Sequence, residues 1–134
     1  MRQVCIIIKQ KINSRREYVR NRNSFKKGSM EMLILILLRS QDCYGYELSQ
    51  EIKKQSEKRI SITEGSLYPA LYRLTEKGYI SDYKKRVGKR LTRVYYHLEP
   101  AGEDFLKTLI QDYLEVHQGI QKIFSFNHVD IENI

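Results

Sequence analysis

A ten-residue stretch, GSLYPALYRL at residues 65–74, carries side chains suited to binding a nucleic acid. Hydroxyls can hydrogen-bond phosphates or base edges, and exposed amides at a helix start suit a phosphate. A guanidinium offers a two-pronged donor for guanine or phosphate, while proline and tyrosine rings offer stiff apolar surface for thymine methyls or sugars. The predicted DNA contacts here are Gly65, Ser66, Tyr68, Pro69, Tyr72 and Arg73. The alternative is that the tyrosines pack on the first helix.

The same stretch has the period of an α-helix with one buried stripe. Its leucines recur at i, i+4 and i+7: Leu67, Leu71 and Leu74. If Thr63 is the N-cap, Pro69 lies inside the helix and crowds the carbonyl of Gly65, whereas if Ser66 is the N-cap, Pro69 falls in the first turn. We expect an irregular first turn and an end at Gly78.

A basic β-hairpin is predicted next. Residues 79–87 and 94–98 have strand character, with a turn at residues 88–90. The cations are concentrated in residues 84–93, and the predicted DNA contacts among them are Arg86, Lys89, Arg90 and Arg93. Lys27 and Tyr44, on either side of the first predicted helix, are expected to add contacts to the DNA backbone. The alternative reading of such a charge run is a solvated surface.

The elements before this stretch are expected to brace it. Gly28 and Ser29 open a helix, and the apolar run at residues 32–38 predicts that protein surrounds it. A second helix is predicted over residues 44–54, and residues 60–63 alternate like a short strand. Three helices followed by a twisted hairpin predict a winged helix-turn-helix, a mainly α fold with a small antiparallel β-hairpin.

The last predicted helix starts at Glu99-Pro100, where proline suits the first turn. Its apolar residues follow a heptad-like seam that predicts pairing with a second copy: Leu106, Leu109, Tyr113, Val116, Ile120 and Ile123. The expected organisation is a basic extension at 1–26, a DNA-binding domain at 27–98, a dimerisation helix at 99–126 and a tail at 127–134. The extension is expected to be partly disordered or a short helix, and would be a mobile tail or an arm on nucleic acid or anionic membrane.

Composition argues against several other classes. The net charge of +8 comes from residues 1–27, and a polyanionic partner fits that distribution. The longest apolar run is far shorter than the roughly 20 residues of a membrane span. The cysteines and histidines have no disulfide or metal spacing, so we expect a cytoplasmic protein without cofactor or metal. The sequence has no phosphate-cradling glycine loop and no nucleophile–base arrangement, which predicts no enzymatic activity.

Five segments together resemble the PadR family of transcriptional regulators: KGSMEMLILILL (27–38), YGYEL (44–48), GSLYPALYRL (65–74), KGYI (77–80) and VYYHLEPAG (94–102). The resemblance, over residues 27–124, implies a bacterial winged-helix dimer, usually a repressor, that binds a palindromic operator and dimerises through its C-terminal helix. It also implies that residues 66–72 belong to the recognition helix and residues 88–93 to the wing. Glu99-Pro100 departs from the usual threonine, and the extension is outside the usual pattern.

Two other functions stay open. An apolar small molecule between the last and first helices, lined by Met30, Phe105 and Tyr113, would release the DNA, although a filled core is the simpler interpretation. Alternatively, the helix and the hairpin would bind a protein partner, and binding would then lack the strong salt dependence of phosphate contacts.

Overall fold

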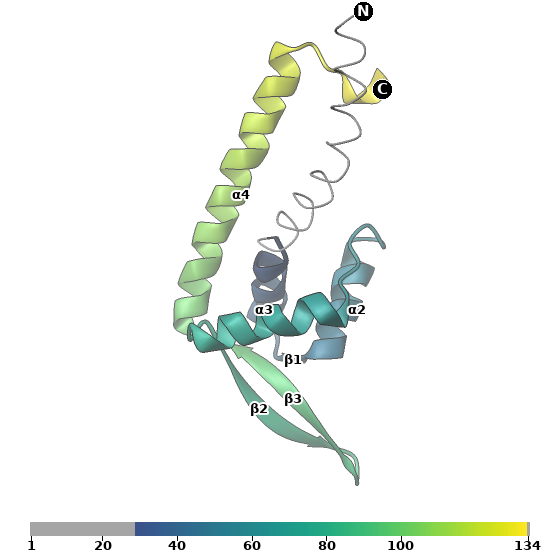
Figure 1. The fold of residues 1–134 in the computed structure, drawn as a ribbon, viewed down its shortest axis with the longest axis vertical. Coiled ribbons are helices and arrows are strands. Elements are labelled where there is room, and N and C mark those ends of the chain that lie inside the picture. Colours follow the sequence, from purple (N-terminus) through teal and green to yellow (C-terminus); the bar gives the residue numbers. More distant parts are fainter. Residues whose placement is uncertain (1–28, 134) are drawn as a thin grey trace, which may run out of the picture.

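The computed structural model describes residues 29–133 and confirms the winged helix-turn-helix architecture. Its elements, in chain order, are a helix at residues 29–40, β1 (Cys43–Tyr44), α2 (Gly45–Gln55), α3 (Glu64–Glu76), β2 (Ile80–Val87), β3 (Leu91–Leu98), α4 (Pro100–Phe126) and the 3-10 helix η1 (Ile131–Asn133). Figure 1 shows the β2–β3 hairpin and α4 projecting from the helical body in opposite directions.

The core lies where the first helix meets α2, α3, β2 and the base of α4. Its apolar side chains are at most 9% exposed and include Met30, Met32, Ile34, Leu35, Leu38, Leu48, Leu67, Ala70, Leu71, Leu74, Ile80 and Leu106. Burying one leucine or isoleucine contributes about 1.5–3 kcal/mol. The prediction that protein surrounds residues 32–38 holds on most sides, but Ile36 is 39% exposed.

Helix α3 begins as the first of the two alternatives predicted. Thr63 is the N-cap residue, and its carbonyl accepts hydrogen bonds from the amides of Ser66 and Leu67 at 3.1 and 2.9 Å. Pro69 therefore lies inside the helix. The carbonyl that loses its helical partner is that of Gly65, which is exposed and can bond water instead.

The end of α3 is set by Gly78, as predicted. Gly78 has a φ of +74°, a conformation that suits glycine, and the Tyr79 amide donates to the Leu74 carbonyl at 3.0 Å. This closing turn directs the chain straight into β2.

The sheet has the order β1-β3-β2 and is antiparallel throughout. The hairpin register runs from Ile80 opposite Leu98 to Val87 opposite Leu91, and Gly88 turns the chain with a φ of +76°. β1 adds only two residue pairs to β3. Because side chains alternate, one face of the hairpin base is buried against the core and the other is turned outward.

The prediction of a short strand at residues 60–63 is wrong. These residues are irregular, and the third strand of the sheet is β1 instead. The Ser56 hydroxyl holds this connection, since it accepts a hydrogen bond from the Ile60 amide at 3.0 Å. The apolar alternation reflects partial burial of Ile62 against the core, without any ladder of backbone bonds.

The base of α4 is packed tightly against the start of β2. A Cβ at Gly102 would overlap the carbonyl oxygen of Tyr79, so only glycine fits there. The rings of Tyr79 and Phe105 stack with centroids 4.3 Å apart. Glu99 precedes the helix without capping it through its side chain, and instead accepts a hydrogen bond from the Ser81 hydroxyl at 2.6 Å.

Candidate nucleic-acid interface

The outward face of α3 carries most of the predicted contacts. Tyr68 is 47% exposed and Tyr72 is 67% exposed, and Gly65, Ser66 and Pro69 lie exposed on the same helix. The opposite face is the buried leucine stripe. We call Tyr68, Pro69 and Tyr72 the α3 ridge. It offers two phenol hydroxyls and a stiff apolar ring on the exposed part of one helix.

Tyr68 is held in place by the start of α2. A Cβ added to Gly45 would come within 2.8 Å of the Tyr68 hydroxyl and about 3.0 Å of its ring. The absence of a side chain at Gly45 therefore makes room for the Tyr68 ring. The alternative predicted that the tyrosines pack on the first helix. Tyr68 instead lies against Gly45 of α2, and Tyr72 is turned outward.

Arg73 lies apart from the ridge. Its Nε donates to the Glu31 carboxylate at 3.2 Å, and only 33% of its side chain is exposed. The pair joins α3 to the first helix across a long sequence separation. This position favours a bracing role for Arg73 over base reading.

Residues 63–66 at the start of α3 are exposed to solvent. The Thr63 side chain makes no capping bond to the amides and instead donates to the Ser66 hydroxyl at 3.2 Å. Uncapped amides and the helix dipole together favour an anion. Glu64 puts a carboxylate in the first turn, which opposes a phosphate at this position.

The hairpin, or wing, holds its cations in an ordered turn. Arg86, Lys89 and Arg90 are all exposed, and Arg86 donates to the Lys89 carbonyl at 3.0 Å. This bond joins the two sides of the tip. The three predicted tip contacts therefore lie together and accessible.

The strand register sorts the other wing cations onto two faces. Lys84 and Arg86 share the face of Ile80, which is the face that packs toward the helices at the base of the wing. Lys84 is a candidate contact that the sequence alone did not single out, because only the register fixes its side. Lys85 and Arg93 lie on the opposite face.

Tyr44 and Arg93, both predicted to contact DNA, are brought together on that opposite face. The Arg93 guanidinium lies 4.4 Å from the centroid of the Tyr44 ring, and Tyr44 meets Tyr95 edge-on at 5.6 Å. Lys85 lies over Tyr95 at 5.2 Å. Each cation has an aromatic partner within the wing root, so this face is less available to DNA than the tip.

A small polar cluster joins the wing to the end of the first helix. Asp42 accepts a hydrogen bond from the Tyr83 hydroxyl at 2.7 Å, and its other oxygen lies 2.7 Å from His97 Nδ1. Burial pulls the pKa of Asp42 up, but the hydrogen bonds from Tyr83 and His97 outweigh it and the pKa is lowered. The same bonds raise the pKa of Tyr83 to about 12 and raise the pKa of His97 above its ordinary value.

The seam predicted along α4 divides into two parts. Leu106 is buried in the core and Leu109 is half-buried against it. The remaining four members are 42–62% exposed: Tyr113, Val116, Ile120 and Ile123. The distal half of α4 thus presents an apolar strip that the described part of the chain leaves uncovered.

Other kinds of site find little support in the described residues. These residues include no group of three metal-ligating side chains and no helix long and apolar enough to cross a membrane. Burial raises the pKa of the Cys43 thiol to about 12, so it is unreactive. Lys27 and the basic extension lie outside the described residues.

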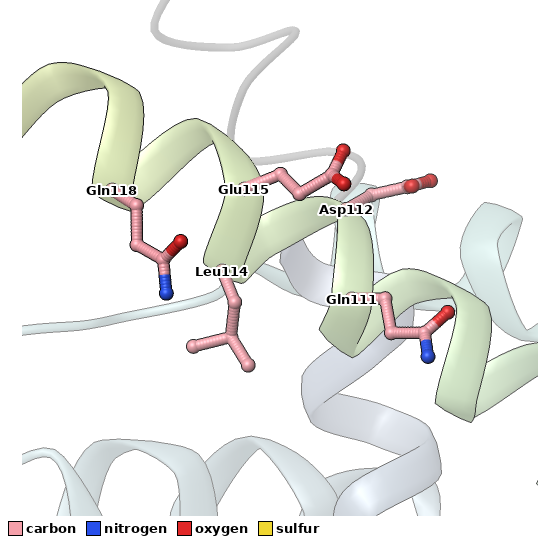
Figure 2. Close-up of a pocket in the computed structure, with 5 residues that line it drawn as sticks. All are labelled: Gln111, Asp112, Leu114, Glu115 and Gln118. Carbon is pink, nitrogen blue, oxygen red and sulfur yellow. The ribbon is translucent and has the colours of Figure 1, made fainter.

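Two hollows lie on the surface of the described residues. Neither corresponds to the ligand space predicted between the last and first helices. One is lined by Gln111, Asp112, Leu114, Glu115 and Gln118, all from α4 (Figure 2), so no second element closes it. The other lies between the first helix and α2. Met30, Phe105 and Tyr113, the predicted lining, border neither of them.

The sequence and the fold of this chain both match those of known proteins. A model of the transcriptional regulator PadR-like family matches residues 34–108. A Lysinibacillus sphaericus protein called "Uncharacterized protein X" is 33% identical over 99 residues, which cover 74% of this chain and 91% of that protein. A transcriptional regulator structure from Clostridium thermocellum is similar with a TM-score of 0.69 and 32% identity, over 74% of this chain and 96% of that one.

Bacillus subtilis PadR in complex with operator DNA is also similar, with a TM-score of 0.57 and 27% identity. The match covers 61% of this chain and 46% of that PadR chain. The present chain therefore spans less than half of that PadR chain.

Proposed function

This chain belongs to the transcriptional regulator PadR-like family, and we propose that it is a sequence-specific DNA-binding repressor that acts as a homodimer on a palindromic operator. The observation that carries the proposal is the exposed α3 ridge of Tyr68, Pro69 and Tyr72, opposite a fully buried stripe. A helix with this division of faces is suited to lie in a major groove while its predecessor braces it.

The wing complements α3 in this proposal. Arg86, Lys89 and Arg90 at its exposed tip are placed to contact phosphates or the adjacent minor groove, and Lys84 shares the face of Arg86. Arg73 supports α3 through Glu31, and Tyr44 with Arg93 supports the root of the wing. The direct contacts are thus assigned to the ridge and the tip, because Glu64 opposes a phosphate at the start of α3.

A second copy of the chain is the proposed cover for the distal half of α4. Tyr113, Val116, Ile120 and Ile123 recur at coiled-coil spacing and remain exposed. A two-fold pair would present two α3 ridges to one duplex, and a palindrome with half-sites about one helical turn apart, roughly 34 Å, would match it.

The direct test is a binding titration with DNA fragments that tile the region upstream of its own gene. We expect one fragment to bind far more tightly than the others, with a salt slope of about −0.9 for each phosphate neutralised. Equal binding to all fragments would contradict a sequence-specific regulator. Weak salt dependence would favour the protein-binding alternative. Repression itself is tested by a reporter gene placed behind the bound fragment.

An apolar effector has less support than DNA binding. Met30 is buried in the core, and Phe105 is stacked on Tyr79. In a single protomer these side chains fill the space that the predicted ligand would need.

A further inference from the structure

We propose that Asp42, Tyr83 and His97 form a positioning cluster that fixes the angle of the wing against the helices and makes DNA affinity depend on pH. The inference rests on the proposed function, because it takes DNA as the ligand of the wing. The three residues come from the segment after the first helix, from β2 and from β3, and meet at one carboxylate. None of them belongs to the ridge or to the tip.

Backbone pairing between the wing and the rest of the body is short, although Ile80 at the wing root is buried in the core and Tyr96 and Leu98 pack against it. β1 contributes only the pairs Cys43–Tyr96 and Tyr44–Tyr95 to the sheet. Asp42 extends this attachment by one residue and reaches both wing strands at once, with two contacts of 2.7 Å. It is thus a direct polar tie between the helical body and both strands.

The length of the wing amplifies small movements at its root. From His97 to Leu91, β3 runs about 20 Å at roughly 3.3 Å per residue. A rotation of about 10° at the root would therefore displace the tip by about 3–4 Å, as much as the length of a hydrogen bond. Arg86, Lys89 and Arg90 would then lose the phosphate contacts proposed for them. Figure 1 shows the wing extending away from the helices toward its tip.

The strength of the tie changes with the protonation of His97. Because a carboxylate only accepts hydrogen bonds, Nδ1 carries the proton in the bond to Asp42, and a second proton on the ring makes the contact an ion pair. The groups facing the cluster are Tyr83 and Lys85 from β2, Tyr95 from β3 and Glu99 after β3. Histidine is the side chain whose ordinary pKa lies near neutral pH, so His97 is the group through which we expect pH to act.

The sign of the effect follows from the raised pKa of His97. The ion pair is fully formed below the ordinary histidine pKa of about 6.5, and it is lost as the pH rises through the folded-state value. The wing is therefore held most firmly at mildly acidic pH. We expect DNA affinity to fall as the pH increases.

The experiment measures affinity for the tightest upstream fragment at pH 6.0 and pH 8.5, at one ionic strength. Wild-type affinity is expected to fall about two- to fivefold, the size typical of an exposed charged pair. Asp42→Asn and His97→Gln are expected to bind more weakly at pH 6.0 and to lose most of the pH dependence. Asp42→Asn keeps the His97 imidazole but removes its ion pair. It therefore distinguishes the positioning role of the pair from direct attraction between a charged His97 and DNA.

Two controls leave the cluster intact. Ser81→Ala removes the hydrogen bond to Glu99 at the position paired with His97, but it adds and removes no titratable side chain. His128→Asn removes an exposed histidine remote from the wing. Both are expected to keep the wild-type pH dependence.

An NMR titration of the free protein completes the test. The pKa of His97 is expected to drop in Asp42→Asn, and to be higher in the wild-type DNA complex than in the free protein, because linkage is reciprocal. If wild type binds DNA but His97→Gln shows the same pH dependence and affinity, the cluster has no positioning role. If wild type binds none of the fragments at either pH, the proposed function itself is wrong and the inference falls with it.

Discussion

Helices α3 and α4 differ in the kind of side chain that they leave exposed to solvent. α3 buries all of its large aliphatic side chains and presents a ridge of phenols and proline. α4 buries Leu106 near its start but leaves Val116, Ile120 and Ile123 in contact with solvent. One protomer therefore completes the packing of α3 but not that of α4. This difference is the basis of our proposal that α3 meets a polar, charged partner and that a second copy covers distal α4.

The largest expected effect comes from placing charge on distal α4. Val116→Asp with Ile120→Asp would bury two carboxylates in a dimer seam, so the dimer is expected to dissociate. Loss of the linked second half-site should weaken DNA binding by about 10²- to 10⁴-fold. Sedimentation and a binding titration measure both effects.

The matched control for that variant is Gln118→Asp, which adds one charge outside the seam of the same helix. It should leave the dimer intact. A double variant that stays dimeric, or a monomer with undiminished DNA affinity, would break the contrast between α3 and α4.

A second prediction compares the effect on stability of replacing two glycines of α4, Gly102 near its start and Gly119 in its distal half. Gly102→Ala forces a Cβ into the Tyr79 carbonyl, and should lower the free energy of unfolding by about 1–3 kcal/mol or more. Gly119→Ala meets nothing within 4 Å and should raise the stability by about 0.5–1 kcal/mol, since alanine favours a helix. Urea denaturation distinguishes these signs, and equal effects would mean that the base of α4 is not tightly packed.

A third prediction concerns the ridge. Tyr72→Ala is expected to weaken operator binding by about tenfold, or ~1.4 kcal/mol, because it removes a groove contact. Its melting temperature should stay unchanged, since Tyr72 is 67% exposed. Tyr46→Ala, at a tyrosine of α2 that is 55% exposed and outside the ridge, is the matched control. Equal affinity losses in both variants would show that the ridge has no special role.

The smallest predicted effect tests how α2 positions the ridge. Gly45→Ala should displace the Tyr68 ring and weaken DNA binding by about threefold, a loss of less than 1 kcal/mol. In the Tyr68→Ala background the same change should cost nothing further, because the obstructed ring is gone. A cost that persists in the double variant would assign the effect to α2 itself.

The sequence predicted the parts of this molecule that depend on local rules. The leucine period of α3 and the glycine after it mark its buried face and its end, and the hairpin turn follows from Gly88. The start of α3 stayed open because Pro69 was compatible with two caps, and only the packed structure selects Thr63. A two-residue strand such as β1 has no period to detect, whereas residues 60–63 alternate without forming a strand.

The sequence could not predict contacts that depend on register or on tertiary distance. Arg73 was predicted to contact DNA, but its ion-pair partner, Glu31, lies in another helix. The sequence does not show that the two side chains meet. Lys84 and Lys85 point to opposite faces as neighbours in any strand do, but only the pairing shows that Lys84 shares the face of Ile80. Asp42 and His97 are similarly distant in the chain, and nothing in their spacing indicates that they meet.

Hydroxyl-radical footprinting on the tightest upstream fragment tests the central claim most directly. Two copies that present their α3 ridges to one duplex should protect two patches on the same face, with centres about 10 base pairs apart. The Val116→Asp, Ile120→Asp variant should lose both patches at the same protein concentration. A single protected patch, or two patches on opposite faces of the duplex, would contradict the account.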